Sequence, residues 1–407
     1  MTQGRMHTMT HVRDGFSLAH RAALMVAGAR RTLMTVVSAL VVASLAVVGV
    51  SYAGGLEELG VLNFGSGPAS LAGLCLNCNI PVFTAGGGTD KVPTVNITGT
   101  PLKGGITLLS GATTITATPL GALAVSSGIL SAVEEYAPNA NGGSGPVVFI
   151  SGAAPCTGCK PIDISLPEGI AFVPKTTTLP LLQQSFYVAN FTGDPKPANA
   201  GSVLLFPAIA GTSTWTGNLL GTIHNTLVCK ALGLPQTALL LPVGVATDTA
   251  GNAYVANFGD AALGAPAYVT EYTLAKAAIS TTGCFAPANL VGLGILKSAN
   301  GVAVDTKGNI WVSDSIANAI FEFSPAGAVL TEIFGKKTTL DNPVGIALSP
   351  SGLKAGVDDL YVANSQRGSI LLFQNVNSIG VQKNLKGIQV LKGPKTKLTT
   401  PIGIAPL

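Results

Sequence analysis

Residues 298–323 read SANGVAVDTKGNIWVSDSIANAIFEF and contain three short apolar runs separated by turn residues. The first two runs flank Asp-Thr-Lys-Gly-Asn at 305–309, a spacing typical of a tight hairpin. The third run ends at Phe323. Short runs rich in Val, Ile and aromatic residues are typical of β-strands. This stretch therefore predicts three consecutive antiparallel strands.

The same pattern recurs at three other places in the chain. Residues 241–257 read LPVGVATDTAGNAYVAN, and the pairs LPEG with YVAN at 166–190 and NPVG with YVAN at 342–364 repeat it more loosely. Each copy continues into a third run that ends in an aromatic residue, at positions 206, 272, 323 and 373. Three or four short strands cannot bury both faces alone, so repeated units of this kind are expected to pack together as blades of a β-propeller.

The two ends of the chain predict how the ring is completed. Residues 61–63, 80–83 and 93–97 form second, third and fourth strands with no first strand before them, whereas 400–407 resemble a first strand with nothing after it. Pairing them would remove two exposed sheet edges. The predicted six blades are 59–98 with 400–407, 104–152 with its first strand at 105–109, 166–224, 241–292, 298–335 and 341–391. Seven blades is the alternative, if 207–240 contains a degenerate unit.

These repeats resemble those of the NHL-repeat family, most closely at 298–323 and well at 241–272, 341–373 and 166–206. The resemblance implies an all-β fold, a six-bladed β-propeller related to streptogramin-lyase-like and lactonase propellers. Streptogramin lyases use His and Glu around a metal. After residue 53 this chain offers only His224, in a predicted loop, so that motif is not located.

The first 53 residues are expected to direct export. Residues 32–53 carry no charge, Arg30 and Arg31 precede them, and Ser51 and Ala53 end the stretch with small residues, which predicts a signal peptide cleaved after Ala53. The apolar stretch is nearly long enough to span a bilayer, so an uncleaved anchor helix is the alternative. Both interpretations predict a periplasmic, cell-surface or extracellular protein, with residues 1–53 as leader or anchor and 54–407 as the propeller.

Composition limits the possible partners. Hydrophobic residues make up 47% of the chain and charged residues 10%, which excludes a coiled coil and wholesale disorder. Residues 1–53 contain five Arg and one Asp, which leaves 18 basic and 18 acidic residues in 54–407. With no overall positive charge left for a phosphate backbone, no nucleic-acid partner is expected. Contact with a membrane is expected only through the N-terminal segment.

The candidate site lies where the first strands begin, at one mouth of the central channel. The middle residue of Pro-x-Gly, which is Ala-x-Gly at 299–301, is polar at Glu168 and Asn300 but apolar at Val243, Val344 and Ile402. The second strands end at a polar residue in each copy, which is also typical of turn formers that bond backbone N–H groups. The channel-mouth candidates are Glu168, Asn190, Asn257, Asn300, Asp314 and Asn364, and the corresponding upstream positions are Asn63 and Ser126.

A carboxylate with several amide oxygens would suit Ca²⁺ or another hard divalent cation. The resemblance implies the same, because related six-bladed lactonases hold a metal with Glu, Asn and Asp. The candidate metal ligands are Glu168, Asn257 and Asp314. A solvated Glu168 with no metal is the competing interpretation, and no other cofactor is expected.

The six cysteines are expected to form disulfides, because an even number in an exported chain is typical of oxidised pairs. The predicted pairs are local bridges within Cys75–Cys78 and Cys156–Cys159, with Cys229 and Cys284 left to join adjacent blades. Crossed pairing between the two CxxC motifs, or a metal or redox role for them, stays open.

Two functions therefore follow from the sequence. The first is an exported, monomeric, non-enzymatic propeller that binds a protein, glycan or small-molecule ligand as a scaffold in the cell envelope or outside the cell. The alternative is a metal-dependent lactonase, lyase or hydrolase with its site at the channel mouth.

Overall fold

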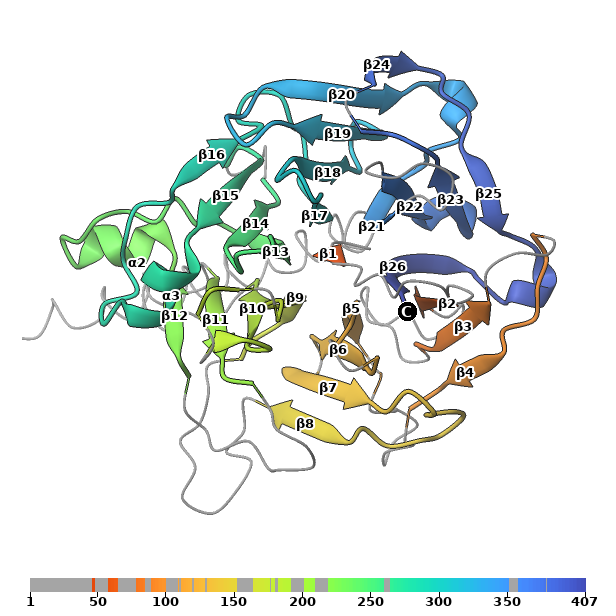
Figure 1. The fold of residues 1–407 in the computed structure, drawn as a ribbon, viewed down its shortest axis with the longest axis horizontal. Helices are drawn as coiled ribbons and strands as arrows, with labels where there is room; N and C mark the ends of the chain where they lie inside the picture. The colour runs from red at the N-terminus through yellow and green to blue at the C-terminus, as the bar shows by residue number, and fades with distance from the viewer. Residues whose placement is uncertain are drawn as a thin grey trace, which may run out of the picture.

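A computed structural model describes residues 46–47, 58–64, 78–84, 89–99, 109, 111–118, 121–128, 130–151, 164–175, 177–179, 182–191, 201–208, 219–259, 264–350, 358–377 and 379–407. Within these ranges, six sheets are arranged as blades around a central axis (Figure 1). The chain is therefore an all-β, six-bladed propeller with few helices, as the repeats predict. The described part of 207–240 forms a strand and a short helix rather than a seventh blade.

The first three blades hold the N-terminal half of the ring. Blade 1 contains β26 (Thr400–Pro406), β2 (Glu58–Phe64), β3 (Ile80–Thr84) and β4 (Val95–Ile97), from the axis outward. Blade 2 contains β5 (Ala112–Ala117), β6 (Leu123–Ser127), β7 (Ala132–Tyr136) and β8 (Val148–Ser151). Blade 3 contains β9 (Pro167–Phe172), β10 (Phe186–Asn190), β11 (Ser202–Phe206) and β12 (Gly221–His224).

The other three blades follow in order. Blade 4 contains β13 (Pro242–Thr247), β14 (Ala253–Asn257), β15 (Tyr268–Tyr272) and β16 (Asn289–Val291). Blade 5 contains β17 (Val302–Val304), β18 (Ile310–Asp314), β19 (Ala319–Phe323) and β20 (Val329–Phe334). Blade 6 contains β21 (Pro343–Pro350), β22 (Asp358–Asn364), β23 (Ser369–Phe373) and β25 (Ile388–Leu391). Helices α2 (Thr226–Ala231) and α3 (Leu274–Ile279) lie outside the sheets at the edge of blades 3 and 4 (Figure 1).

Strands from both ends of the chain meet in blade 1. β26 pairs antiparallel with β2, and the register places Val61 opposite Ile404 and Leu62 opposite Gly403. β26 is the innermost strand of this sheet, in the position that the first strand of each repeat takes elsewhere.

The turn Asp-x-x-Gly-Asn explains why the first two strands of a repeat form a hairpin. The Asp305 carboxylate accepts the backbone N–H groups of Lys307 and Asn309 at 2.9 and 2.8 Å. Asp248 accepts the equivalent N–H groups of Ala250 and Asn252, both at 2.9 Å. A carboxylate that bonds the turn that follows it favours this conformation in the isolated segment.

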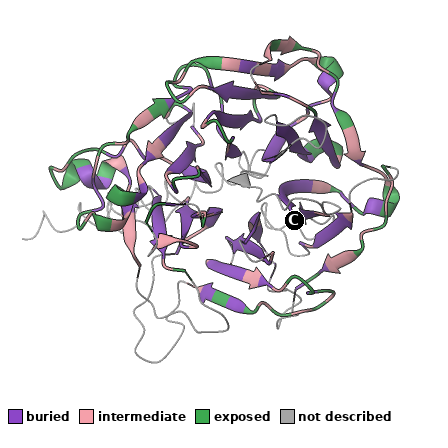
Figure 2. Cartoon of the chain, in the orientation of Figure 1, coloured by how far each residue is buried: buried purple, intermediate pink, exposed green. Residues whose placement is uncertain are grey.

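The core lies mainly between neighbouring blades. One apolar cluster joins blades 1, 2 and 6, including Val61, Ile115 and Ile404, and another joins blades 5 and 6, including Trp311 and Val362. Figure 2 shows the inner strands buried and exposure concentrated on the outer strands and rim. Each blade therefore depends on its neighbours for burial, which is why the units cannot fold separately.

Three features differ from the sequence prediction or were not foreseen by it. The first strand of blade 2 is β5, Ala112–Ala117, whose β-branched run 113–116 pairs with β6; of the predicted first strand 105–109, only Leu109, which lies in a turn, is among the described residues. β24 (Gly380–Lys383) leaves blade 6 and pairs in parallel with β20 of blade 5. β1 (Ala46–Val47), inside the segment predicted as a helix, is a strand parallel to β21, opposite Ile346 and Ala347.

β1 lies at the centre of the ring (Figure 1). The inner edge of β21 has no partner from its own blade, so the backbone of the two residues of β1 can pair with it there. The rest of the predicted signal or anchor segment lies outside the described residues. Of the helices in the described part of the chain, none is both long and apolar enough to cross a bilayer.

Candidate functional site

The first strands all begin on one face of the ring, called the mouth face here. In blades 1, 3, 4 and 6, the proline of Pro-x-Gly lies opposite an Asn at the second-strand end, as Pro167 lies opposite Asn190. In blade 2 the same register pairs Ala112 with Ser127, so Ser127, not Ser126, takes the second-strand position. The x positions form one residue set, called the mouth ring: Thr113, Glu168, Val243, Asn300, Val344 and Ile402.

The glycine of Pro-x-Gly lets neighbouring inner strands approach closely. A Cβ on Gly244 would lie 2.5 Å from the backbone oxygen of Asn300, and a Cβ on Gly345 would lie 2.5 Å from that of Ile402. A Cβ on Gly169 would lie 2.9 Å from the Val243 oxygen. Each glycine thus faces the mouth-ring residue of the next blade, which fixes that residue against its neighbour.

Glu168 is the charged member of the mouth ring, and it is buried. Its side chain is 7% exposed, and its Oε2 has no hydrogen-bond partner. Burial raises the pKa of this carboxyl well above its usual range, since a low-polarity surrounding disfavours the charged form. The raised pKa favours the neutral carboxyl, which can donate one hydrogen bond and accept others.

Asn300 has a similar unpartnered oxygen two blades away. The side chain is fully buried, and its Nδ2 donates to the Oγ of Ser315 at 2.6 Å. Its Oδ1 has no partner. Glu168 and Asn300 are therefore the two polar mouth-ring residues with an unpaired buried oxygen, and sequence reasoning singled out both because they replace apolar residues at x.

The other predicted candidates bond to the chain itself. The side-chain oxygens of Asn257, Asp314 and Asn364 each accept a backbone N–H at 2.7 Å, from Leu240, Lys297 and Asp341. Asn190 accepts the N–H of Ser165 at 3.4 Å, and Asn63 that of Thr399 at 3.0 Å. In all five cases the donor lies three residues before the mouth-ring residue of the same blade. These side chains hold the start of the first strand.

The predicted metal ligands differ in how fully their side chains are hydrogen-bonded within the protein. Besides Lys297, the Asp314 carboxylate accepts the Ser298 hydroxyl at 3.0 Å and the Ala317 N–H at 2.8 Å. Asn257 also donates to Thr270 at 3.2 Å. Over the ranges that the structure describes, no group of three or more His, Cys, Asp and Glu side chains is placed to hold a metal ion. Among the predicted channel-mouth candidates in these ranges, the buried oxygens without a hydrogen-bond partner are Oε2 of Glu168 and Oδ1 of Asn300.

The cysteines are partly described. Cys229 in α2 and Cys284 in the connection between α3 and β16 form a disulfide with a Cα–Cα distance of 5.5 Å, as predicted. It ties the segment after blade 3 to blade 4. Cys78 is also disulfide-bonded, whereas Cys75, Cys156 and Cys159 lie outside the described residues.

His224 lies away from the mouth ring. It ends β12, the outermost strand of blade 3, rather than lying in a loop as the sequence suggested. Its backbone N–H donates to Gly283 at 2.9 Å, and its backbone oxygen accepts the Thr237 hydroxyl at 2.7 Å.

A buried carboxyl in blade 2 was missed by sequence reasoning. Glu134 on β7 is fully buried and accepts the Tyr136 hydroxyl at 2.7 Å through Oε2, while Oε1 has no partner. Burial raises its pKa to about 8, and the hydrogen bond from Tyr136 opposes part of that rise. The signal was present in the sequence: in a strand, two consecutive Glu residues face opposite sides, so one of Glu134 and Glu135 had to face a neighbouring blade.

No protein-family model matches the chain. No curated protein matches it either. Among solved structures, a protein of unknown function from Bacteroides caccae matches with a TM-score of 0.51 and 14% identity, over 87% of this chain and 99% of its own. The nidogen/laminin complex matches with a TM-score of 0.48 and 12% identity, over 86% of this chain and 98% of its own. Streptogramin B lyase matches with a TM-score of 0.39 and 12% identity, over 72% of this chain and 71% of its own. The Bacteroides likeness supports a shared propeller fold and carries no function.

Proposed function

We propose that this chain is an exported NHL-type propeller that binds a ligand at its mouth face and acts as a scaffold in the cell envelope or outside the cell. The proposal rests on a difference between two groups of polar residues at the mouth face. The repeated Asn and Asp residues hold the first strands, whereas Glu168 and Asn300 keep a buried oxygen unpaired.

The mouth ring suits a ligand with both apolar and donor groups. Val243, Val344 and Ile402 are buried aliphatic residues, while Glu168 and Asn300 offer acceptors. Small binding sites commonly combine an apolar lining with a few such polar groups. A ligand donor that bonds either oxygen would remove the cost of leaving it unpaired.

Binding is tested with envelope material. The exported protein is mixed with a washed envelope fraction of its own organism and sedimented, beside Glu168→Leu and Asn300→Leu variants. We expect wild type to co-sediment and both variants to lose at least ten-fold in binding. Glu134→Gln, which alters a buried carboxyl away from the mouth ring, is the matched control and should bind as wild type does. Equal sedimentation of all four proteins, or none, contradicts the proposal.

Export has independent support and a separate test. A disulfide such as Cys229–Cys284 is typical of oxidising compartments, and residues 1–53 have the composition of a leader. N-terminal sequencing of the protein recovered outside the cytoplasm should begin at Gly54 if the leader is cleaved, a form of the protein that would lack β1. Recovery from the membrane with residues 1–53 intact supports the anchored form. Recovery in the cytoplasm contradicts export.

A metal-dependent hydrolase, lactonase or lyase is the second candidate. The unpaired oxygens of Glu168 and Asn300 favour it, because hard cations bind such groups. Calorimetric titration with Ca²⁺ is the test. Binding by wild type that Glu168→Gln abolishes and Asp314→Asn preserves supports a cation at the mouth. If the wild-type protein binds no Ca²⁺, the metal-dependent enzyme is contradicted and the binding role is the remaining proposal.

A further inference from the structure

The charges of the propeller are balanced in total but unevenly placed. Residues 54–335 contain nine basic and fifteen acidic residues, and residues 336–407 contain nine basic and three acidic ones, a difference of −6 against +6. The positive part comprises blade 6, the strand β24 that crosses to blade 5, and the start of β26.

Chain topology brings four of these lysines together. β24 ends beside the end of β20, where Lys383 lies opposite Phe334. Directly after these strands, the Asn384 side-chain oxygen accepts the backbone N–H of Lys337 at 3.1 Å. Lys336, Lys337, Lys383 and Lys386 are all exposed. They therefore meet at one corner of the rim, although they are about fifty residues apart in sequence.

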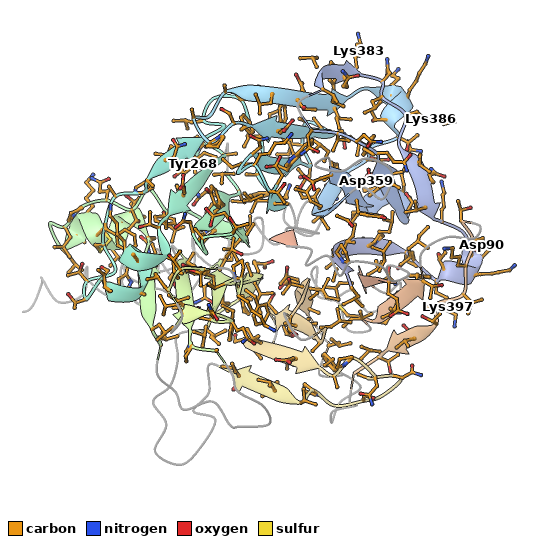
Figure 3. All side chains as sticks on the ribbon, viewed as in Figure 1. Asp90, Tyr268, Asp359, Lys383, Lys386 and Lys397 are labelled. Atoms are coloured by element: carbon orange, nitrogen blue, oxygen red, sulfur yellow. A yellow bond between two sulfur atoms is a disulfide. The ribbon has the colours of Figure 1, made fainter. Side chains whose placement is uncertain are left out.

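Two further lysines continue the same edge. β25 leads from Lys386 to a turn with the pattern of 335–338, in which the Asp90 carboxylate accepts the Lys395 N–H at 2.8 Å. Lys395 and Lys397 are exposed. Figure 3 shows Lys383, Lys386 and Lys397 along the outer edge of the ring, with Asp90 near Lys397. These six residues are called the lysine band: Lys336, Lys337, Lys383, Lys386, Lys395 and Lys397.

Nearby carboxylates do not neutralise the lysine band. Asp341 pairs with Arg367 at 3.4 Å, which is the one ion pair among the described residues. Asp358 and Asp359 are buried, and Asp90 is engaged with the Lys395 backbone. Glu332 on β20 is half-buried and precedes the corner. The ammonium groups are therefore free to attract an anion.

We propose that the lysine band binds a flexible acidic glycan, a partner class that rests on the envelope-binding role proposed above. Lys383, Lys386 and Lys397 follow a convex outline in this view, along which a linear chain can bend (Figure 3). The band includes no Arg and no aromatic side chain, the groups on which nucleobases stack. Lysine acts as a point charge that tolerates carboxylate, sulfate or phosphate alike.

A protective role of lysine on sheet edges is the competing explanation. Lys383 lies on the edge strand β24 and would discourage pairing with another sheet. Lys336 and Lys337 lie in a short 3-10 helix (Lys336–Thr338), and Lys395 lies in another (Pro394–Thr396) that Lys397 follows; all four are outside any edge strand. Protection of a sheet edge therefore accounts for the position of Lys383 but not for the positions of most lysines in the band.

The test uses dextran sulfate and polygalacturonate as probes, with neutral dextran as the reference. The band variant carries Lys336→Gln, Lys337→Gln, Lys383→Gln and Lys386→Gln. The control variant carries Lys230→Gln, Lys276→Gln, Lys297→Gln and Lys307→Gln, four exposed lysines elsewhere on the ring, so both variants lose the same net charge. We expect the full-length protein to bind both acidic glycans, the band variant to bind at least ten-fold more weakly, and the control to stay within two-fold. Binding should weaken steeply as salt rises.

Several results would overturn this assignment. Equal losses in both variants would show dependence on net charge alone. Stronger band-dependent binding to anionic lipid vesicles or to a single-stranded oligonucleotide would name another partner. Unchanged glycan binding with new self-association of the band variant would establish edge protection instead. Envelope binding that depends on Glu168 but not on the lysine band would contradict this inference and leave the proposed function intact.

Discussion

The Asp314 side chain lies 2.7 Å from the backbone nitrogen of Lys297 and accepts its N–H, across the hairpin that opens blade 5. The same carboxylate also accepts the Ser298 hydroxyl and the Ala317 N–H. One side chain thus fixes the start of the first strand and the turn after the second. Asn257 and Asn364 do the same for the first strands of blades 4 and 6.

Replacing Asp314 by alanine should destabilise the propeller without affecting ligand affinity at the mouth. Three donors would lose their acceptor, the buried Ser298 hydroxyl and two part-buried backbone N–H groups, which we expect to lower the free energy of unfolding by about 2 to 4 kcal/mol. Asp314→Asn keeps an acceptor and should cost less. Urea unfolding measures both. An alanine variant as stable as wild type would show that this side chain is not structural, and would make it available as a cation ligand.

The role of these residues was partly predictable from sequence. An Asn or Asp at one place in every repeat indicates a turn former, and the structure adds the identity of the donor, three residues before the mouth ring. That donor could not be predicted, because its segment has no repeated side chain: Ser165, Leu240, Lys297, Asp341 and Thr399. A backbone group leaves no mark in sequence.

Gly244 should not tolerate a methyl group. A Cβ there would lie 2.5 Å from the Asn300 backbone oxygen, so Gly244→Ala must push blades 4 and 5 apart, at a cost of about 1 to 3 kcal/mol. Gly128→Ala is the matched control, because its nearest neighbours would lie at 3.4 Å or beyond. Thermal unfolding compares the two. If the two variants unfold at the same temperature, the close approach of neighbouring strands is not the reason for the repeated glycine.

Strand pairing outside the repeat was beyond sequence reasoning. Blade 2 lacks Pro-x-Gly, and the sequence predicts its first strand at 105–109, whereas Ala112–Ala117 pairs with β6. The register decides this, because Ile115 lies opposite Val125 as Ile170 lies opposite Val188 in blade 3. β24 has a strand-like sequence too, but its partner β20 belongs to another blade. A local pattern predicts a strand and does not name its neighbour.

The Cys229–Cys284 disulfide should contribute to stability independently of the other cysteines. It closes a segment of 55 residues, and in the chain-entropy account removing it costs about 4 kcal/mol. The double variant Cys229→Ser with Cys284→Ser tests this by urea unfolding without reductant. Since the disulfide lies at the outer edge of blades 3 and 4, envelope binding should survive at temperatures where the variant is folded. An unchanged unfolding midpoint would show that this bond is dispensable.

Glu134 should make the propeller less stable as pH rises. Its pKa is raised to about 8 in the fold from an ordinary value of 4.5, so between these two values the folded chain holds a proton that the unfolded chain has released. Stability therefore falls with rising pH across this window, by up to about 1.4 kcal/mol per pH unit from this group, and levels off above the folded pKa.

The variant Glu134→Gln isolates that contribution. A glutamine keeps the shape and can still accept the Tyr136 hydroxyl, but it does not titrate. Burial also raises the pKa of Glu135, Glu271 and Asp358, so wild type and variant share those slopes and only their difference reports on Glu134. Urea unfolding at pH 5, 6, 7 and 8 should show that the free energy of unfolding of the variant increases relative to that of wild type at each step. A constant difference across the series would mean that Glu134 does not change protonation on unfolding, and that a charged carboxylate is accommodated between blades 1 and 2.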